Sequence, residues 1–321
     1  MGRVFLFYVC QIAIAIFSMS PKKMSTVLDA SGYVIDDGLA TLVWMAMELD
    51  RPMLLEGEAG VGKTAMALAL ATALKRPLFR LQCHESLDLH QAVYEWNYTK
   101  QLLEIRLREA ENKVDHELRQ DLFSQEFLLQ RPLLQALSSD EPAVLLIDEI
   151  DRADESFEAY LLEMLGEYQI SVPELGTIKA NTHPIVVLTS NGTRDLSDAL
   201  RRRCLYYFLD YPSLPREIDI VKKLVPNAHV ELIQQAVIFV HKLRKQDLEK
   251  NPGIAETLDW VRALYAMGQD SLPDDLEMIR ACLASLLKTR SDRWQMESHL
   301  ESLMATENRV GRDVGVAGAL K

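Results

Sequence analysis

The stretch that decides the fold reads Leu54-Leu55-Glu56-Gly57-Glu58-Ala59-Gly60-Val61-Gly62-Lys63-Thr64. An apolar strand end leads into G-x-x-x-x-G-K-T, the spacing of a loop that cradles the phosphates of a nucleoside triphosphate. The backbone amides of such a loop, and of the helix behind it, point at an anion. Residues 65–74 are rich in Ala and Leu and predict that helix. The sequence therefore predicts a nucleotide-binding protein.

The residue types of the loop suit distinct tasks. We expect the ammonium of Lys63 to reach the β- and γ-phosphates of ATP, and the hydroxyl of Thr64 to ligate Mg²⁺. Positive φ angles are expected at Gly57, Gly60 and Gly62, where no Cβ keeps the backbone away from the phosphates. The expected ATP contacts span the whole loop: Gly57, Glu58, Ala59, Gly60, Val61, Gly62, Lys63, Thr64 and Ala65.

Length and composition bound the rest of the chain. With 321 residues, 48% of them hydrophobic and 26% charged, we expect a nucleotide-binding domain plus a smaller domain. The formal net charge of -12 opposes non-specific attraction to nucleic-acid phosphate and favours a protein partner. Four cysteines lack C-x-x-C spacing, which is typical of a reducing compartment, and neither a disulfide nor zinc is assigned to them: Cys10, Cys83, Cys204 and Cys282.

The chain opens on an apolar run over residues 4–17, interrupted only by Gln11. This run is short for a bilayer span and has the length of a signal-peptide core. Residues 18–20 lack a small-x-small cleavage pattern, and an ATPase needs cytosolic ATP, so we expect a cytoplasmic protein whose residues 1–25 lie outside the fold. Met19 and Met24 favour a misassigned start or a disordered extension over the alternative, a membrane-associated anchor.

Strand signals alternate with helical patterns over residues 26–212, which predicts an α/β core with a parallel sheet flanked by helices. Strands are expected at 53–55, 78–82, 143–147 and 184–189, an irregular hairpin at 169–178, and a helix through 43–47. Residues 86–137 are interpreted as a mostly helical insertion with a solvated charged face at 104–109. After Pro212 and Pro215, helical periodicity at 230–245, 254–267 and 276–289 predicts a small all-helical lid over 213–321.

Two acidic residues, Asp148 and Glu149, follow the strand predicted at 143–147. Ligands of open α/β sheets bind beyond the carboxyl ends of the strands, where this pair stands. Asp148 is expected to hold Mg²⁺ through water, and Glu149 to polarise the attacking water. A lone acidic pair is usually only solvated, but combined with the phosphate-binding loop this pair predicts hydrolysis.

Asn191 and an arginine cluster follow the strand predicted at 184–189. The Asn191 amide either positions a γ-phosphate oxygen and the attacking water or caps the next turn, and the sequence leaves the two alternatives even. Arg201, Arg202 and Arg203 cannot all face one way, so we expect some surface salt bridges and at least one arginine finger on a neighbouring subunit's γ-phosphate. A finger in trans requires a ring or another oligomer.

Three further patterns have ordinary explanations that we favour. Apolar residues at 157, 161, 162 and 165 form a core-facing helical stripe. The alternating aromatics Tyr94, Trp96 and Tyr98 are expected to pack within the insertion rather than to grip a client. A metal site at Cys83, His84 and His90 is disfavoured because no fourth ligand stands at a suitable spacing.

The order of phosphate loop, Leu-Leu-Ile-Asp-Glu, strand-end Asn, Arg cluster and helical lid resembles the AAA+ ATPases, and within them the MoxR family. Four segments are similar to the branch that contains the carbon monoxide dehydrogenase accessory D-protein: LQCHESLD at 81–88, AVYEWNY at 92–98, IDEIDRAD at 147–154 and ALRRRC at 199–204. The resemblance covers about residues 34–268, most of the chain.

The resemblance implies a ring-forming ATPase that matures a client metalloenzyme, often a molybdenum hydroxylase, together with a von Willebrand A-domain partner. It implies that Asp148 and Glu149 form the Walker B pair, that Asn191 is sensor 1 and that Arg203 is the finger. Two departures stand out. Gly192 replaces an expected Arg, and residues 253–257 offer no sensor 2 arginine, so that lid coupling rests on Arg262 or another residue.

Two other functions compete with an ATP-driven chaperone. A nucleic-acid motor or clamp loader is disfavoured by the acidic balance and by the lack of a basic stripe interleaved with aromatics. A non-hydrolysing nucleotide-gated scaffold stays open because of the missing lid arginine. Steady-state phosphate release separates the scaffold from the ATPase.

Overall fold

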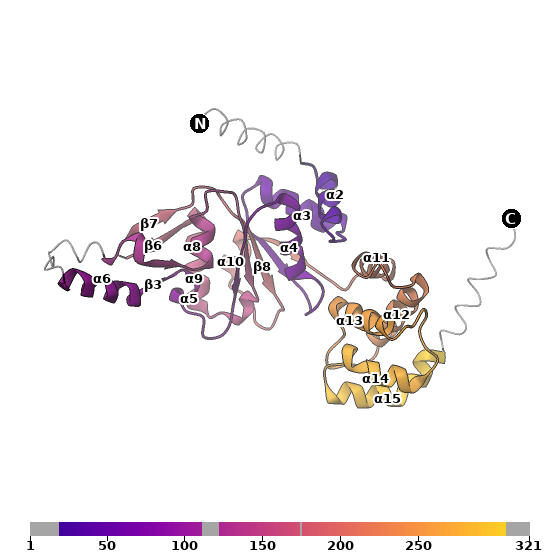
Figure 1. Cartoon of the computed structure of the whole chain (residues 1–321). Helices are drawn as coiled ribbons and strands as arrows, with labels where there is room; N and C mark the ends of the chain where they lie inside the picture. The colour runs from indigo at the N-terminus through magenta and orange to yellow at the C-terminus, as the bar shows by residue number, and fades with distance from the viewer. Residues whose placement is uncertain (1–18, 111–121, 174, 306–321) are drawn as a thin grey trace. The chain divides into compact units, whose positions relative to one another are not determined.

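The computed structural model of the chain describes residues 19–110, 122–173 and 175–305 (Figure 1). These residues divide into two compact units. The first holds the residues up to Gly57 together with Lys63–Phe208, and the second holds Glu58–Gly62 together with the chain from Leu209 onward. The second boundary lies close to the junction predicted at residue 212.

The first unit is built on a five-stranded parallel sheet of order β2-β5-β8-β1-β9. Its strands are β1 Met53–Glu56, β2 Leu78–Gln82, β5 Val144–Asp148, β8 Ile185–Ser190 and β9 Leu205–Phe208. Buried apolar runs form β5 and β8 because both faces of these central strands are covered. The predicted parallel sheet is confirmed, and the edge strand β9 is an addition to it.

Helices cover both faces of this sheet. One face contacts α4 Lys63–Leu74, with α2 Pro21–Ala30 and α3 Asp37–Glu48 beside it. The other face packs against α8 Pro132–Leu137 and α9 Glu155–Glu167, and α10 Asp198–Arg203 contacts α9. The Asp154 carboxylate starts α9 by accepting a hydrogen bond from Phe157 N at 2.7 Å.

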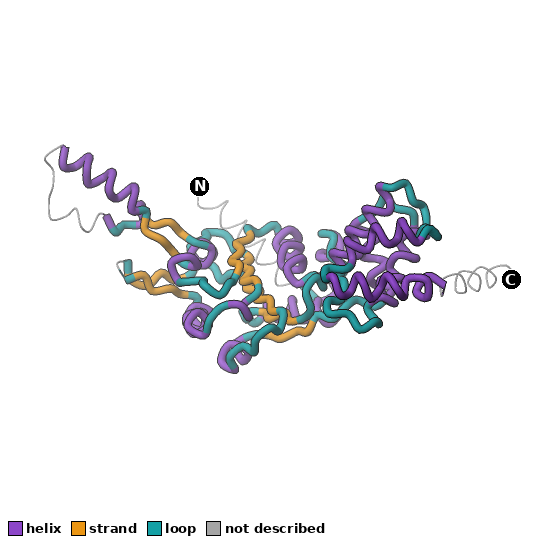
Figure 2. The backbone as a smooth tube through the Cα atoms, turned by 90° about the horizontal axis from the view of Figure 1, so that it is seen from below, coloured by secondary structure: helices purple, strands orange, loops and turns teal. Residues whose placement is uncertain are grey.

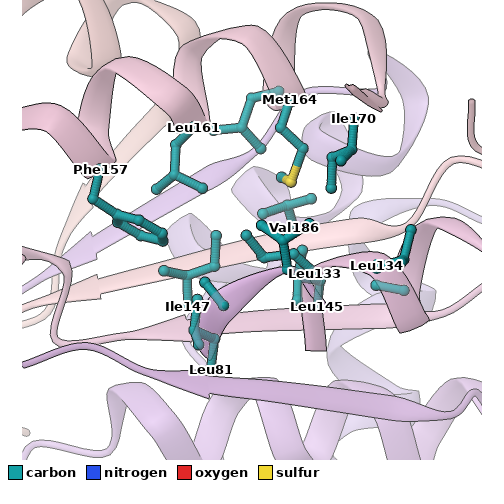
Figure 3. Packing of buried hydrophobic residues seen from close by; sticks show 14 of the residues in the cluster. Leu81, Leu133, Leu134, Leu145, Ile147, Phe157, Leu161, Met164, Ile170 and Val186 are labelled. Atoms are coloured by element: carbon teal, nitrogen blue, oxygen red, sulfur yellow. The ribbon is translucent and has the colours of Figure 1, made fainter. Parts of the chain in front are cut away.

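Figure 3 shows how α9 meets the sheet. The side chains of Phe157, Leu161 and Met164 point from the helix toward Ile147 and Val186 on the strands, and all five residues are at most 2% exposed. Burying such side chains stabilises the unit by roughly 1.5–3 kcal/mol each. The predicted core-facing stripe at 157, 161 and 165 is confirmed, while Leu162 is only partly buried.

The predicted helical insertion is only partly helical. Its elements are α5 Leu89–Ala92, β3 Tyr94–Trp96, α6 Tyr98–Ala110, the 3-10 turn η1 Gln125–Phe127 and β4 Leu128–Gln130. Strands β3 and β4 pair antiparallel, so the prediction of a mostly helical segment is wrong there, whereas the hairpin of β6 Gln169–Val172 and β7 Gly176–Lys179 is confirmed. Trp96 is buried against Tyr94 and Phe123, as expected, but Tyr98 is 62% exposed.

The N-terminal boundary of the fold also differs from the prediction. Helix α2 begins at Pro21, and Met24 and Leu28 on it are fully buried. Residues 21–25 therefore belong to the first unit, because an apolar helix face needs a partner surface. The apolar run at 4–17 lies outside the described residues, and within those residues no helix is long and apolar enough to cross a bilayer.

The second unit is all helical in its described part, as predicted (Figure 2). Its helices are α11 Leu214–Leu224, α12 Val230–Leu243, α13 Ile254–Ala266, α14 Leu276–Leu286 and α15 Arg290–Ala305. Phe239 and Trp260 are fully buried at the centre of the core, with ring centroids 5.0 Å apart. The core is thus built mainly by α12, α13 and α14, the three helices that the sequence predicts.

Candidate nucleotide site

The glycine-rich loop joins the carboxyl end of β1 to the start of α4. The φ angles are 158° at Gly57, 79° at Gly60 and 101° at Gly62, all in the positive range that favours glycine. Helix α4 begins at Lys63, so its N-terminal amides lie directly behind the loop. The sequence prediction of three positive-φ glycines is confirmed, and the backbone is shaped to hold an anion.

Lys63 is only 6% exposed. Its Nζ donates a hydrogen bond to the Gly57 carbonyl oxygen at 2.6 Å. This contact holds the positive charge beside the loop, because a buried ammonium needs an acceptor. A phosphate oxygen entering the loop would meet a cation that is already in place.

Asp148 is the last residue of β5, and its carboxylate accepts hydrogen bonds from hydroxyl groups on two other elements. Its Oδ1 accepts a hydrogen bond from Thr64 Oγ1 at 3.0 Å and from Thr189 Oγ1 at 2.5 Å. Asp148 is 3% exposed, and Thr189 lies on β8 next to β5 in the sheet. The two residues predicted to hold Mg²⁺, Thr64 and Asp148, are therefore in contact.

The structure adds to the site an arginine that no sequence pattern singles out. Arg80 on β2 places Nη2 2.6 Å from Asp148 Oδ2. In the register of the two strands, Gln82 lies beside Asp148, so Arg80, two residues earlier, projects from the same face of the sheet. A basic residue in a short strand carries no signal for this pairing.

Glu149 follows directly and adopts a left-handed backbone, with φ 56° and ψ 50°. Its amide donates to Thr189 Oγ1 at 2.9 Å, and its carboxylate forms an ion pair with Arg152 at 3.2 Å. A non-glycine residue in this conformation costs of order 1–3 kcal/mol, and such strain clusters at functional sites. The turn directs the carboxylate away from the sheet interior, into a cavity.

Asn191 lines the same cavity as Glu149, directly after β8. The amides of the turn behind Asn191 are taken by other residues: Gly192 N donates to Ser190 Oγ at 3.0 Å, and Thr193 N donates to Asp151 Oδ2 at 3.0 Å. Ser190 and Asp151 therefore cap the backbone amides of this turn. Capping was the alternative to a positioning role for the side-chain amide of Asn191.

Gly192 sits in this turn with φ 70°, a conformation that favours glycine. A Cβ added at Gly192 would meet no atom within 4 Å, so a side chain would fit in the available space. The positive φ angle, which favours glycine, therefore explains why Gly stands here in place of the expected Arg.

Asp151 ties the Asn191 turn to the Walker B segment. Its Oδ2 also accepts a hydrogen bond from Thr193 Oγ1 at 2.6 Å. Burial alone raises the pKa of Asp151. Hydrogen bonds from the Thr193 hydroxyl and from the backbone amides of Thr193 and Asn191 outweigh burial and lower the pKa below its ordinary value. The turn that carries Asn191 is thus held by an ionised carboxylate near neutral pH.

The three arginines of α10 have three different surroundings. Arg201 forms an ion pair with Glu56 at 3.3 Å, the guanidinium of Arg203 donates to the Leu162 carbonyl oxygen, and Arg202 has an exposed side chain. Arg203 stands just before β9, which begins beside the first residue of β1. It therefore lies at the amino edge of the sheet, away from Asp148 and Glu149 at the carboxyl edge, and does not join the site of its own chain.

Two weaker suggestions from the sequence are the metal site at Cys83, His84 and His90, which was disfavoured, and the sensing role of Arg262. The side chain of His90 lies outside the described residues, so the full triad is not tested. No group of three or more His, Cys, Asp or Glu side chains in the described part of the chain could hold a metal ion. Burial, aided by the charge of Asp148, raises the pKa of the Cys83 thiol to about 12, so the thiolate that a metal needs is disfavoured. Arg262, the lid residue suggested for sensing, forms an exposed surface pair with Asp259 at 3.4 Å.

Inside the second unit, the start of α13 contacts the tip of the glycine-rich loop. Ile254 N donates to the Gly60 carbonyl oxygen at 2.9 Å. A Cβ added at Gly253 would lie 2.7 Å from Gly60 Cα, so only glycine permits this approach. Thr257, in the stretch where sensor 2 was expected, is fully buried and hydrogen-bonded to Glu217.

Comparison with known proteins agrees with the geometry. Residues 52–204 match the family described as AAA domain (dynein-related subfamily). The gas vesicle ATPase GvpN2 of Halobacterium salinarum is 24% identical over 291 residues, which cover 86% of this chain and 81% of the relative. The gas vesicle ATPase GvpN of Haloferax mediterranei is 25% identical over 271 residues, 80% of this chain and 74% of the relative. Residues 52–204 are thus similar to an AAA domain, and most of the chain is similar in sequence to the gas vesicle ATPases.

A solved structure of a Thermotoga maritima RuvB mutant aligns with a TM-score of 0.46 at 15% identity, over 83% of this chain and 70% of that chain. An uncharacterized protein of Staphylococcus haemolyticus is 26% identical over 222 residues, 67% of this chain and 76% of the relative.

Proposed function

We propose that this chain, whose residues 52–204 match an AAA domain, is a Mg²⁺-dependent ATPase of the MoxR type that remodels a protein partner. The observation that carries the proposal is the meeting of the Thr64 hydroxyl with the Asp148 carboxylate at 3.0 Å, one residue before a strained Glu149. Hydroxyl and carboxylate oxygens are the donors that Mg²⁺ prefers, so the residues fit this ion.

Each residue of the site has a task in hydrolysis. Thr64 and Asp148 would hold a magnesium ion, which would supply positive charge to offset the charge of the phosphates. Lys63 holds the phosphates, Glu149 accepts a proton from the attacking water, and Asn191 keeps that water in line with the γ-phosphate. Thr64 and Asp148 hold the ion, with Thr189 fixing the Asp148 carboxylate.

Replacing Lys63 by Ala tests the nucleotide site. Losing one charge-assisted contact of about 1.5–3 kcal/mol should weaken Mg-ATP binding by about 10- to 100-fold in calorimetry. Lys179→Ala, which removes an exposed lysine on β7, should bind like the wild type. A folded wild-type protein that gives no binding heat with Mg-ATP would contradict the proposed function altogether.

We further propose that Arg203 acts in trans, so that the active form is a ring or another oligomer. The position of Arg203 at the amino edge of the sheet supports this, since it cannot reach the phosphates of its own chain. An arginine donated across an interface would stabilise the charge on the γ-phosphate of the neighbour.

Mixing two inactive variants tests the trans role of Arg203. Arg203→Ala keeps the base, and Glu149→Gln keeps the arginine, so random assembly places one intact pair at about a quarter of the interfaces. ATPase activity should reappear in the mixture and rise more than linearly with protein concentration. Two variants that stay inactive together, or an Arg203→Ala protein with full activity alone, would refute the assignment.

The partner class follows from family likeness. The MoxR resemblance points to a von Willebrand A-domain protein and a metalloenzyme client such as a molybdenum hydroxylase in the cytoplasm, whereas the named relatives are gas vesicle ATPases. The acidic net charge suits a protein partner better than nucleic acid. Affinity capture with Glu149→Gln in ATP identifies the partner.

A further inference from the structure

The Asp148 carboxylate already has a cation beside it. Arg80 Nη2 lies 2.6 Å from Asp148 Oδ2, and the same nitrogen donates to Gln82 Oε1 at 2.8 Å. The Asp148 side chain is 4% exposed and the Arg80 side chain 50% exposed. The negative charge of the buried Asp148 carboxylate is therefore balanced by an arginine whose side chain is half exposed.

This arrangement follows from the sheet. Strand β2 is the sheet edge next to β5, so a long side chain on it can reach the end of β5 and still keep its outer part in water. Asp148 Oδ1 accepts hydrogen bonds from the hydroxyls of Thr64 and Thr189, while Oδ2 contacts the guanidinium at 2.6 Å and the Thr64 hydroxyl at 3.3 Å. A buried carboxylate without a charged partner is strongly destabilising, and Arg80 prevents that state.

We infer that Arg80 is a positioning residue that holds Asp148 in the nucleotide-free protein, competes with Mg²⁺ for its carboxylate and thereby sets the magnesium affinity of the site. The inference rests on the proposed function, since it takes Thr64 and Asp148 as the magnesium ligands. A divalent ion and a guanidinium sharing one carboxylate repel each other, so magnesium binding must displace Arg80 toward solvent.

Replacing Arg80 by Gln removes the competing charge and keeps a polar, uncharged side chain. At a separation of about 5 Å in water the repulsion corresponds to an effect of about 5- to 20-fold, so the Mg²⁺ concentration for half-maximal binding of a fluorescent ADP analogue should fall by that factor. Nucleotide affinity in EDTA should change little. Arg80→Lys keeps the charge and should titrate like the wild type.

Thermal unfolding gives a second readout that needs no activity. In EDTA, Arg80→Gln should lower the melting temperature, because Asp148 is left buried without its cation, and saturating Mg-ADP should shrink this loss. The matched control is Arg131→Gln, which breaks an exposed pair with Glu95 at 2.5 Å and should show the same small loss in both conditions.

The possible outcomes distinguish a failure of the Arg80 inference from a failure of the proposed function. An unchanged or raised Mg²⁺ requirement in Arg80→Gln, an equal melting loss with and without Mg-ADP, or an Arg80→Lys protein that behaves like Arg80→Gln would each overturn the role of Arg80. If the wild type itself binds no Mg-ADP, the proposed function and with it the competition fail, while the EDTA melting comparison still measures the Arg80–Asp148 pair.

Discussion

Glu149→Gln should reduce ATP turnover by about 10²- to 10⁴-fold, the usual contribution of a positioned general base. Gln has the same shape, allows the same left-handed turn and leaves the hydrogen bond from the backbone N–H of residue 149 to Thr189 Oγ1 in place, so the site geometry should persist. The amide cannot accept the proton of the attacking water. ATP affinity should stay within about threefold of the wild type, because the lost interaction belongs to the transition state.

Steady-state phosphate release and equilibrium ATP binding on the same preparation measure the two effects of Glu149→Gln. Glu155→Gln is the matched control, since Glu155 is an exposed acid that lines the same cavity at the start of α9. Turnover in this control should remain near the wild-type rate. Wild-type hydrolysis by Glu149→Gln would show that another group is the base.

Glu217→Ala should destabilise the helical unit by about 3–5 kcal/mol, the cost of leaving a buried charge without its partner. The Glu217 side chain is fully buried, and its two oxygens pair with Arg244 at 2.6 and 2.8 Å. His241 and Thr257 each contact it at 2.8 Å. One carboxylate on α11 thus joins α12, the segment after α12, and α13.

Hydrogen exchange of α12 and α13 amides, together with urea unfolding, checks the Glu217→Ala prediction. The control is Asp259→Ala, which breaks the exposed pair with Arg262 and should change stability by less than about 0.5 kcal/mol. Glu217→Gln keeps hydrogen-bonding capacity and should fall between the two. A loss below about 1 kcal/mol in Glu217→Ala would show that the network is not needed for the lid fold.

Much of the fold could be read from periodicity. The central strands β5 and β8 are continuous apolar runs, and their positions agree with prediction to within a residue or two. Strand β9 was missed because it is four residues long and alternates in exposure at an edge. The β3–β4 pair was missed because its partners are far apart in the chain and each strand has only three residues.

The candidate site likewise contains residues that could be predicted from the sequence and contacts that could not. The glycine-rich loop, the Asp148-Glu149 pair and Asn191 were found because their chemistry demands particular residues at strand ends, and the structure places all three at the carboxyl edge of one sheet. The Asp151–Thr193 clamp and the Arg80–Asp148 pair join residues 42 and 68 positions apart, and no local pattern marks either one.

By itself, the sequence determined what each short segment can do: a loop with glycines where φ must be positive, an acidic pair after a buried strand, and helices whose apolar faces repeat with the helical period. These are local properties, set by backbone sterics and by the period of side chains along an element. Only the tertiary structure decided which charges meet, with Arg80 on Asp148, Arg244 on Glu217 and Arg203 turned away from its own site. The reason is physical: an ion pair depends on distance and burial in space, and chain folding brings together side chains that the sequence keeps apart.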